Sequence, residues 1–321
     1  MRSFLGFIRR AAIAVLVAMI APTSAHADCV ANNPAPAAFG SVTSLNLASQ
    51  QQSTSSPSAG LSCGGALLAF LVNGNMINGT ISSASGGKLT GTTGDAIAYS
   101  MFADKDYSKS LNFGQLYNWA DTQFMSFLGL GGGSNVALPL FFRTAPGSNV
   151  AAGTYTDTLT IAWNWHVCGG AGIGSFCLGW NDGQNTVTFP VTLTVTNDCT
   201  IVAPDANFGA APTVSSFAPV SGSLSLICTK GMTYTVGLSP GNHAAANGRR
   251  QMTSGTNVLQ YDIYAASSGT VWGQATNRVG SGGSADGTSV KTFPYVARIY
   301  SDQSTPPVGT YTDSVIVDVR Y

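Results

Sequence analysis

The chain has 321 residues, of which 9% are charged and 44% are hydrophobic, and its 14 basic residues balance 14 acidic ones, all of them aspartate. This charge is too sparse and too evenly balanced to form a basic field for nucleic acid. The lack of glutamate, together with the many Gly, Ser, Thr and Val residues, favours strands and turns over helices and predicts an all-β protein.

The N-terminus has the pattern of a secretory signal peptide. Arg2, Arg9 and Arg10 precede an apolar run over 11–21, and small residues follow at 25–27. We therefore expect residues 1–27 to be a signal peptide, since the run is shorter than the roughly 18 to 20 residues of a membrane span. The mature chain is then exported and carries 11 basic residues (14 minus 3) against 14 acidic ones.

The mature sequence contains two similar copies in tandem, offset by 170 residues (198 minus 28). We expect two domains, 28–197 and 198–321, with a very short linker around Asn197 and Asp198, so that they stand end to end. The matching stretches are Asp-Cys at 28–29 and 198–199, Phe-Gly at 39–40 and 208–209, and the segments 95–103 and 257–265, 136–143 and 292–299, and 153–163 and 309–319.

Each copy has several short strand patterns separated by Gly, Ser, Asn and Pro turns, which predicts two tandem immunoglobulin-like antiparallel β-sandwich domains. The mature part holds an even number of cysteines in an oxidising export route, so we expect three disulfides. The matching positions suggest one pair in each domain and leave a third pair in a loop. These pairs are Cys29 with Cys63, Cys199 with Cys228, and Cys168 with Cys177.

The two copies end differently. Both contain Gly-Thr-Tyr-Thr-Asp, at 153–157 and at 309–313, but only the first continues into the alternating segment 186–196. This segment has the period of two of a half-buried strand, and the second copy stops at Tyr321 without a counterpart. We therefore expect the second domain to lack one strand and to accept one from another chain. The first domain's cysteine stands near the expected mature N-terminus, so we expect this chain to accept a strand but to have none to donate.

These residues resemble a known family. The Phe-Gly and Cys pattern of each copy and the terminal segments 153–161 and 309–321 resemble the spore coat protein U domain of pilins assembled by the archaic chaperone-usher pathway. Two such domains in one chain are similar to the tip adhesins of Csu-type pili. The resemblance implies a periplasmic pilus chaperone, an outer-membrane usher and an adjacent pilus subunit that donates a β-strand. It also implies exposure on the cell surface at the pilus tip, and contact with a surface through hydrophobic finger-like loops of the first domain.

Three segments of the first copy are candidates for those loops. The loop after 113 is apolar in the first copy, whereas its counterpart after 272 is polar. The segment 168–180 has no counterpart at all, and the segment 73–79 carries Met76 and Ile77 where the second copy has Pro-Gly-Asn-His-Ala-Ala-Ala-Asn-Gly at 240–248. We expect at least two of the three segments to expose apolar tips that bind hydrophobic surfaces and promote biofilm formation, although Trp119 and Phe124 could instead be buried braces. The candidate residues are Met76, Ile77, Trp119, Phe124, Met125, Phe127, Leu128, Leu130, Ile173, Phe176, Leu178 and Trp180.

Other chemistries are less well supported. Cys168 and Cys177 favour a disulfide over zinc in an exported chain, and Asp104 and Asp106 favour a solvated turn over a calcium site. The His residues lack the setting of a hydrolase triad, so we expect no enzyme activity, metal or cofactor. The alternative that stays open is a lectin-like domain that stacks tryptophans on sugar rings, using Trp119, Trp163, Trp165 and Trp180 with Asp121 and Asp182.

Overall fold

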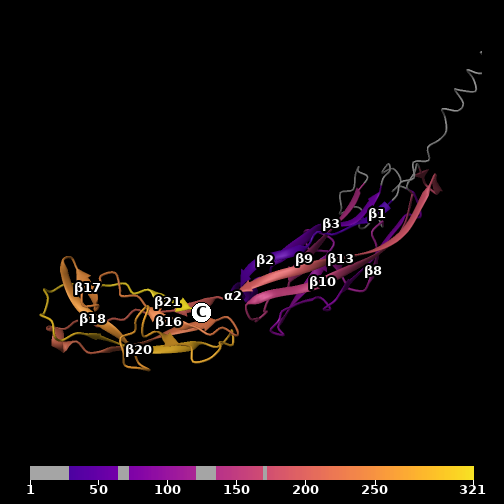
Figure 1. Cartoon of the computed structure of the whole chain (residues 1–321). Coiled ribbons are helices and arrows are strands. Elements are labelled where there is room, and N and C mark those ends of the chain that lie inside the picture. The colour runs from indigo at the N-terminus through magenta and orange to yellow at the C-terminus, as the bar shows by residue number, and fades with distance from the viewer. Residues whose placement is uncertain (1–28, 64–71, 121–134, 169–171) are drawn as a thin grey trace, which may run out of the picture.

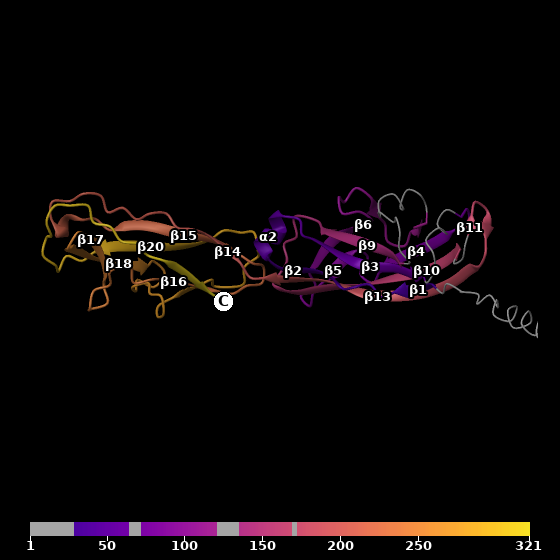
Figure 2. The same ribbon diagram turned by 90° about the horizontal axis from the view of Figure 1, so that it is seen from above.

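The two sequence repeats form two separate groups of β-sheets that lie end to end (Figures 1 and 2). The computed structural model describes residues 29–63, 72–120, 135–168 and 172–321. The strands up to β13 form the first body, and the strands from β14 onward form the second. Among the described residues, no helix is long and apolar enough to cross a membrane.

The first domain is built from strands whose apolar residues alternate with polar ones, because one face of each strand packs on the core. A short helix, α2, follows the second strand. The elements are β1 (Cys29–Asn32), β2 (Ala37–Thr43), α2 (Ser44–Ser49), β3 (Ser53–Cys63), β4 (Met76–Ser83), β5 (Lys88–Thr90), β6 (Ala96–Phe102), β7 (Ser110–Leu111), β8 (Leu116–Asn118), β9 (Asn135–Thr144), β10 (Gly153–Cys168), β11 (Gly172–Ile173), β12 (Phe176–Cys177) and β13 (Trp180–Thr196).

Apart from β11 and β12, the strands of the first domain form one curled sheet that folds over on itself as a sandwich. Its main order is β1-β3-β9-β6-β5-β10-β13-β2, while β4 pairs with β10, β8 with β4 and β7 with β6. The chain changes layers between β1 and β2, since β1 pairs with β3 whereas β2 pairs in parallel with β13. β13 also pairs with β10 along its whole length. The alternation expected for this strand is confirmed, because its inward side chains are at most 5% exposed: Val187, Phe189, Val191, Leu193 and Val195.

The second domain has a five-stranded sheet, β14-β15-β20-β18-β17, opposite a three-stranded one, β19-β16-β21. Their facing side chains form a separate core around Trp272 and Val236, both 0% exposed. The elements are β14 (Cys199–Val202), the short 3-10 helix η2 (Val214–Ser216), β15 (Val220–Cys228), β16 (Thr235–Leu238), β17 (Arg250–Ser254), β18 (Asn257–Ala265), β19 (Val279–Gly280), β20 (Lys291–Ile299) and β21 (Val317–Arg320).

The repeated Gly-Thr-Tyr-Thr-Asp motif makes the same backbone corner in both domains. The hydroxyl of Tyr155 donates to the carbonyl of Ala151 at 2.7 Å, and that of Tyr311 donates to Pro307 at 2.7 Å. A tyrosine whose hydroxyl bonds back to the chain a few residues upstream is typical of immunoglobulin-like sandwiches. The tyrosine of the motif therefore fixes how the chain enters this strand.

The aspartate of the same motif ties two strands together inside each domain. Asp157 accepts from the Tyr99 hydroxyl at 2.6 Å, and Asp313 accepts from the Tyr261 hydroxyl at 2.7 Å. Burial, followed by the neighbouring carboxylate, raises the pKa of both tyrosines far above the usual range. Both hydroxyls thus remain protonated donors, and the duplicated sequence preserves one internal brace.

The disulfides follow the expected pairing wherever both side chains are described. Cys168 is bonded to Cys177, and Cys199 is bonded to Cys228. Cys29 is also in a disulfide, and its backbone lies opposite Cys63 in the β1–β3 ladder. The Cys199–Cys228 bond joins the first strand of the second domain, β14, to β15 beside it.

The two domains meet in a small polar joint. Ser44 Oγ lies 2.6 Å from Thr229 Oγ1, and both side chains are buried. Lys230 Nζ lies 2.5 Å from Asp95 Oδ1, while Asp95 Oδ2 accepts from the backbone N–H of Ala151 at 3.0 Å. The hydrogen bond from Lys230, assisted by Ala151, holds the pKa of Asp95 below its ordinary value of 3.8.

We expect Lys230→Met to loosen this joint. The lysine is 42% exposed, so the ratio of closed to open joints should fall only about two- to fivefold. Acid should act in the same direction: because the pKa of Asp95 is depressed, its contribution is complete above pH 3.8 and is lost as the pH falls through the lower folded value. Small-angle X-ray scattering on the full chain measures both effects.

A matched control is Lys105→Met, which removes an exposed ion pair with Asp106. This variant should leave the scattering curve unchanged. Opening of the wild-type joint near pH 6 would contradict a role for Asp95, because this carboxylate stays ionised there.

Candidate functional site

The end of the first domain that is remote from the second domain carries a small cross-linked hairpin (Figure 2). β10 and β13 extend to this end, where Cys168 lies opposite Trp180. Between them β11 and β12 form a two-stranded hairpin in which Ile173 faces Phe176. The Cys168–Cys177 disulfide ties this hairpin to the last residue of β10, with a Cα–Cα distance of 5.8 Å. The bond limits the disorder of the hairpin and so lowers the entropy that contact with a surface would cost.

A second segment, which precedes β4, is bonded directly to the hairpin. The backbone N–H of Asn73 donates to the Gly174 carbonyl at 2.7 Å, and the Asn75 side chain accepts from the N–H of Cys168 at 2.8 Å. Val72 also pairs with Gly174 in an isolated bridge and packs against Cys168. Two of the three candidate segments are therefore parts of one structure.

The hairpin exposes a group of apolar side chains, which we call the tip patch. Its members are Ile173 (76% exposed), Phe176 (59%), Leu178 (64%) and Trp180 (37%). Large apolar side chains exposed this far and this close together are unusual on a soluble protein and mark contact sites.

The other described candidates are not exposed, and two of them lie inside the molecule. Ile77 is 0% and Trp119 is 1% exposed, so the prediction that they belong to the exposed tip is wrong, and Met76 is only half-buried. The N–H of Trp119 donates to the Ile77 carbonyl at 2.8 Å. A Cβ added at Gly79 would lie 3.0 Å from Trp119 Nε1 and 2.7 Å from Trp163. Trp119 is therefore a buried brace, the alternative that the sequence left open for it. The remaining candidates, Phe124, Met125, Phe127, Leu128 and Leu130, lie outside the described residues.

Polar residues hold Trp180 in place within the tip patch. Its ring stacks on His166 with 4.1 Å between ring centroids, and His166 Nδ1 lies 2.6 Å from Asp182 Oδ1. A Cβ added at Gly74 would lie 3.7 Å from the indole, so this ring also rests against the segment before β4. The sequence contains no local signal for this arrangement, because its parts meet only when β10 and β13 pair.

The corresponding loop of the second domain is exposed at Thr276, Asn277, Ser284 and Asp286, as its polar composition predicts, but two of its residues brace neighbouring strands. Arg278, which aligns with Trp119, is largely buried and bonds to Thr235 and Asp318. Ser281 is 9% exposed and accepts from the N–H of Tyr234. In both copies this loop fastens neighbouring strands, by an indole in the first and a guanidinium in the second.

The second domain has an open edge along its last segment. In the first domain, Leu159, Ile161 and Trp163 of β10 are at most 3% exposed beneath β13. Their counterparts in the terminal segment, Val315, Val317 and Val319, are only partly buried, and Ile316 is 66% exposed. Among the described residues, β21 pairs only with β16, so the place that β13 fills in the first domain has no strand.

The segment after β14 shows the same gap from the other side. In the first domain β2 pairs in parallel with β13 and contains Phe39 and Gly40. The matching Phe208 and Gly209 belong to no strand, and most of the segment 203–213 is exposed. The terminal segment and the segment 203–213 therefore both lack the strand that would lie between them, as β13 lies between β10 and β2 in the first domain.

The described residues contain no group of three or more His, Cys or Asp side chains placed to hold a metal ion. Asp104 accepts instead from the backbone N–H groups of Ser108 and Lys109, at 3.0 and 2.7 Å, as a turn residue does. Of the four tryptophans considered for sugar stacking, Trp119, Trp163 and Trp165 are buried.

A completed sandwich with an apolar tip, joined to an open-edged one, defines a pilin-like structural protein. The chain belongs to the spore coat protein U domain family, whose model matches residues 14–162 and 185–318. A similar solved structure is the CsuC–CsuE chaperone–tip adhesion subunit pre-assembly complex of archaic chaperone-usher Csu pili from Acinetobacter baumannii. It has 25% identity and a TM-score of 0.62, over 91% of this chain and 100% of that one. The family and this neighbour indicate a structural adhesin rather than an enzyme.

More distant structures also align. The CupB6 tip adhesin from Pseudomonas aeruginosa has 13% identity and a TM-score of 0.33, over 92% of this chain and 94% of that one. The CooA pilin subunit from enterotoxigenic Escherichia coli has 14% identity and a TM-score of 0.29, over 53% of this chain and 99% of that one. No curated protein matches the sequence.

Proposed function

We propose that this protein is the tip adhesin of a chaperone-usher pilus, exported through the periplasm to the cell surface, and that its first domain attaches to hydrophobic surfaces and so promotes biofilm formation. The observation that carries the proposal is the tip patch, where Ile173, Phe176 and Leu178 are each more than half exposed on a hairpin closed by a disulfide. The patch lies at the end remote from the second domain (Figure 2).

The mechanism is burial of the tip patch against an apolar surface, which yields about 25 cal/mol for each Å² removed from water. A patch of a few hundred Å² gives only several kcal/mol before ordering costs. Firm attachment therefore comes from many pili that bind at once.

The second domain connects the adhesin to the pilus. Its open edge beside β21 takes an extended strand, first from a periplasmic chaperone and then from the adjacent subunit delivered by the outer-membrane usher. The first domain supports this arrangement, because β13 completes that sandwich and leads after two residues, Asn197 and Asp198, into β14 of the next domain. A donated strand in the second domain repeats the same connection between subunits.

Adhesion of piliated cells to polystyrene in the presence of free sugars tests the adhesive role. We expect adhesion to survive sugars and to fail when Phe127, Leu128 and Ile173 are replaced together by serine, because the contact is apolar. Inhibition by a free glycan would overturn the proposal in favour of a lectin-like tip. Of the four tryptophans in that alternative, only Trp180 is exposed and so available to stack on a sugar.

A further inference from the structure

The terminal segment of the second domain, residues 309–320, is held by polar fasteners along its closed side. The N–H of Ile316 donates to Ser239 Oγ at 2.8 Å, and the N–H of Ser239 donates back to the Ile316 carbonyl at 2.9 Å. Further along, Arg278 Nη1 lies 2.8 Å from Asp318 Oδ2, and Arg278 Nη2 donates to the Asp318 carbonyl at 2.9 Å. The guanidinium thus holds both the side chain and the backbone of β21.

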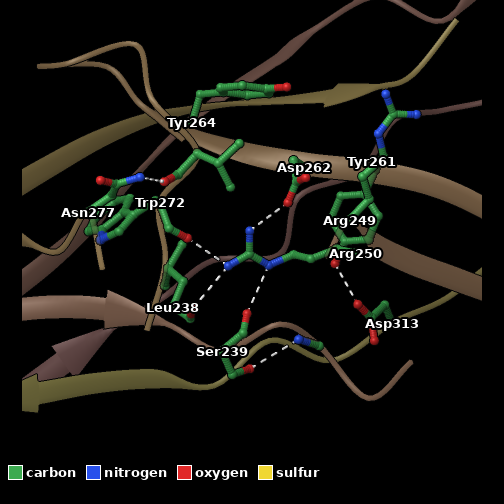
Figure 3. Close-up of polar contacts among 12 residues, drawn as sticks. Leu238, Ser239, Arg249, Arg250, Tyr261, Asp262, Tyr264, Trp272, Asn277 and Asp313 are labelled. Atoms are coloured by element: carbon green, nitrogen blue, oxygen red, sulfur yellow. Dashed lines mark hydrogen bonds and ion pairs between the residues drawn. The ribbon is translucent and has the colours of Figure 1, made fainter. Parts of the chain in front are cut away.

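A buried ion pair supports the first of these fasteners from behind (Figure 3). Arg250 Nη1 lies 2.8 Å from Asp262 Oδ1, and both side chains are 3% exposed. The remaining guanidinium nitrogens of Arg250 donate to the carbonyls of Ser239, Leu238 and Trp272. The pair therefore fixes the end of β16, which presents Ser239 to the terminal segment.

The first domain provides a control, because its equivalent strand is already covered by β13. There, Trp119 stands in the place of Arg278, Ala162 in that of Asp318, and Ser100 in that of Asp262. The Tyr99–Asp157 brace, by contrast, has a counterpart in the second domain, the Tyr261–Asp313 hydrogen bond. The charged fasteners occur in the domain whose edge strand has lost a neighbour.

The contrast has a physical reason. Apolar packing holds a strand well only when the strands on both sides of it complete the core. Charged hydrogen bonds from a guanidinium can hold a strand that has a neighbour on one side only. A buried ion pair adds little net stability compared with apolar packing, but it can fix one geometry. The N–H and carbonyl of Ile316 point toward Ser239. Because successive residues of a strand direct these groups to opposite sides, those of Val315 and Val317 point toward the open edge.

We propose that Arg278 and Asp318, supported by the Arg250–Asp262 pair, are positioning residues that keep the terminal segment extended at the open edge so that an incoming strand can pair with it. This inference rests on the proposed acceptance of a strand by the second domain. The partner that it favours is an extended segment with apolar residues at alternate positions, as in 187–195 of the first domain.

The test measures association and dissociation rates of a labelled peptide of residues 184–196 with the refolding chain, residues 28–321. We expect Arg278→Met and Asp318→Asn each to slow association roughly tenfold, the size of one charged hydrogen bond, with dissociation unchanged. Once the strand is bound, backbone hydrogen bonds on both sides hold β21, so the dissociation rate no longer depends on the Arg278–Asp318 pair. The double variant should be no slower than Arg278→Met, since both changes remove one contact.

Arg249→Met is the matched control, because its bidentate pair with Asp302 lies in the same domain but away from the terminal segment. Association that is as fast in Arg278→Met as in this control would overturn the proposal, as would a parallel rise in dissociation, which marks a merely structural role. Arg278→Lys keeps the charge but loses the fork, and it should fall between wild type and Arg278→Met. Failure of the wild-type chain to bind the peptide would instead overturn strand acceptance itself.

Discussion

Joining a second copy of residues 183–196 to Tyr321 through a two-residue Asn-Gly turn is expected to raise the melting temperature of the second domain by more than about 10 °C. In the first domain Val187 lies opposite Ile161 and Phe189 opposite Leu159. The shared motif transfers this register, so that the added valine and phenylalanine would face Val317 and Val315. Each such side chain gains about 1.5–3 kcal/mol on full burial, and the tether supplies a high effective concentration.

The control carries serine at the five inward positions of the added strand. It keeps the length and the turn but has nothing to bury, so its melting temperature should equal that of the wild type. Differential scanning calorimetry of the mature chain measures the change, because the two domains give separate transitions if they unfold independently. An equal rise in both variants would show that apolar completion is not the cause.

Replacement of Ile173, Phe176 and Leu178 by serine is expected to weaken the binding of a single adhesin to an alkyl-coated surface by more than about a hundredfold. These side chains are 76%, 59% and 64% exposed, so in the free protein they pack on little that their loss would disturb. Each contributes about 1 kcal/mol or more when partly buried against the surface. Surface plasmon resonance on an alkanethiol monolayer, together with counts of retained cells, measures the loss.

The paired control is Val258→Ser with Val290→Ser, which removes exposed apolar residues of the second domain, 42% and 58% exposed, away from the tip patch. This variant should bind as the wild type does. If it loses as much binding as the tip variant, adhesion follows general surface hydrophobicity and not the tip patch.

The architecture could be predicted because it rests on repeated, local patterns. The alternation over 187–195 predicted a strand buried on one face, and the structure buries those five side chains in the core of the first domain. The two copies of Gly-Thr-Tyr-Thr-Asp predicted equivalent places in the two domains, and in both the tyrosine and the aspartate make the same contacts. The first copy begins β10, whereas the second forms only an isolated bridge at Thr312 before β21. Patterns of this kind can be recognised in the sequence, because the alternation of side chains along a strand follows from its own pleated backbone.

The candidate site was harder to predict, because apolar composition does not tell which way a side chain points. Ile77 and Trp119 come from glycine- and polar-rich segments like those of the tip patch, yet they pack together within the first core. Arg278 looked like a solvated loop residue, although it lies against β16 and β21. In each case the deciding contact joins residues that are far apart in the chain.

The sequence by itself determined that the protein is an all-β tandem repeat with a closing strand in the first copy only, because strand periodicity and duplicated motifs are local. Only the tertiary structure decided which apolar residues form the tip patch, since the pairing of β10 with β13 and the Cys168–Cys177 bond turn Ile173, Phe176 and Leu178 outward. It likewise decided that charged residues hold the open edge, because Arg278 and Asp318 meet only when β21 lies beside β16. Whether a side chain is buried depends on the packing of the whole chain, so it cannot be predicted from a short segment alone.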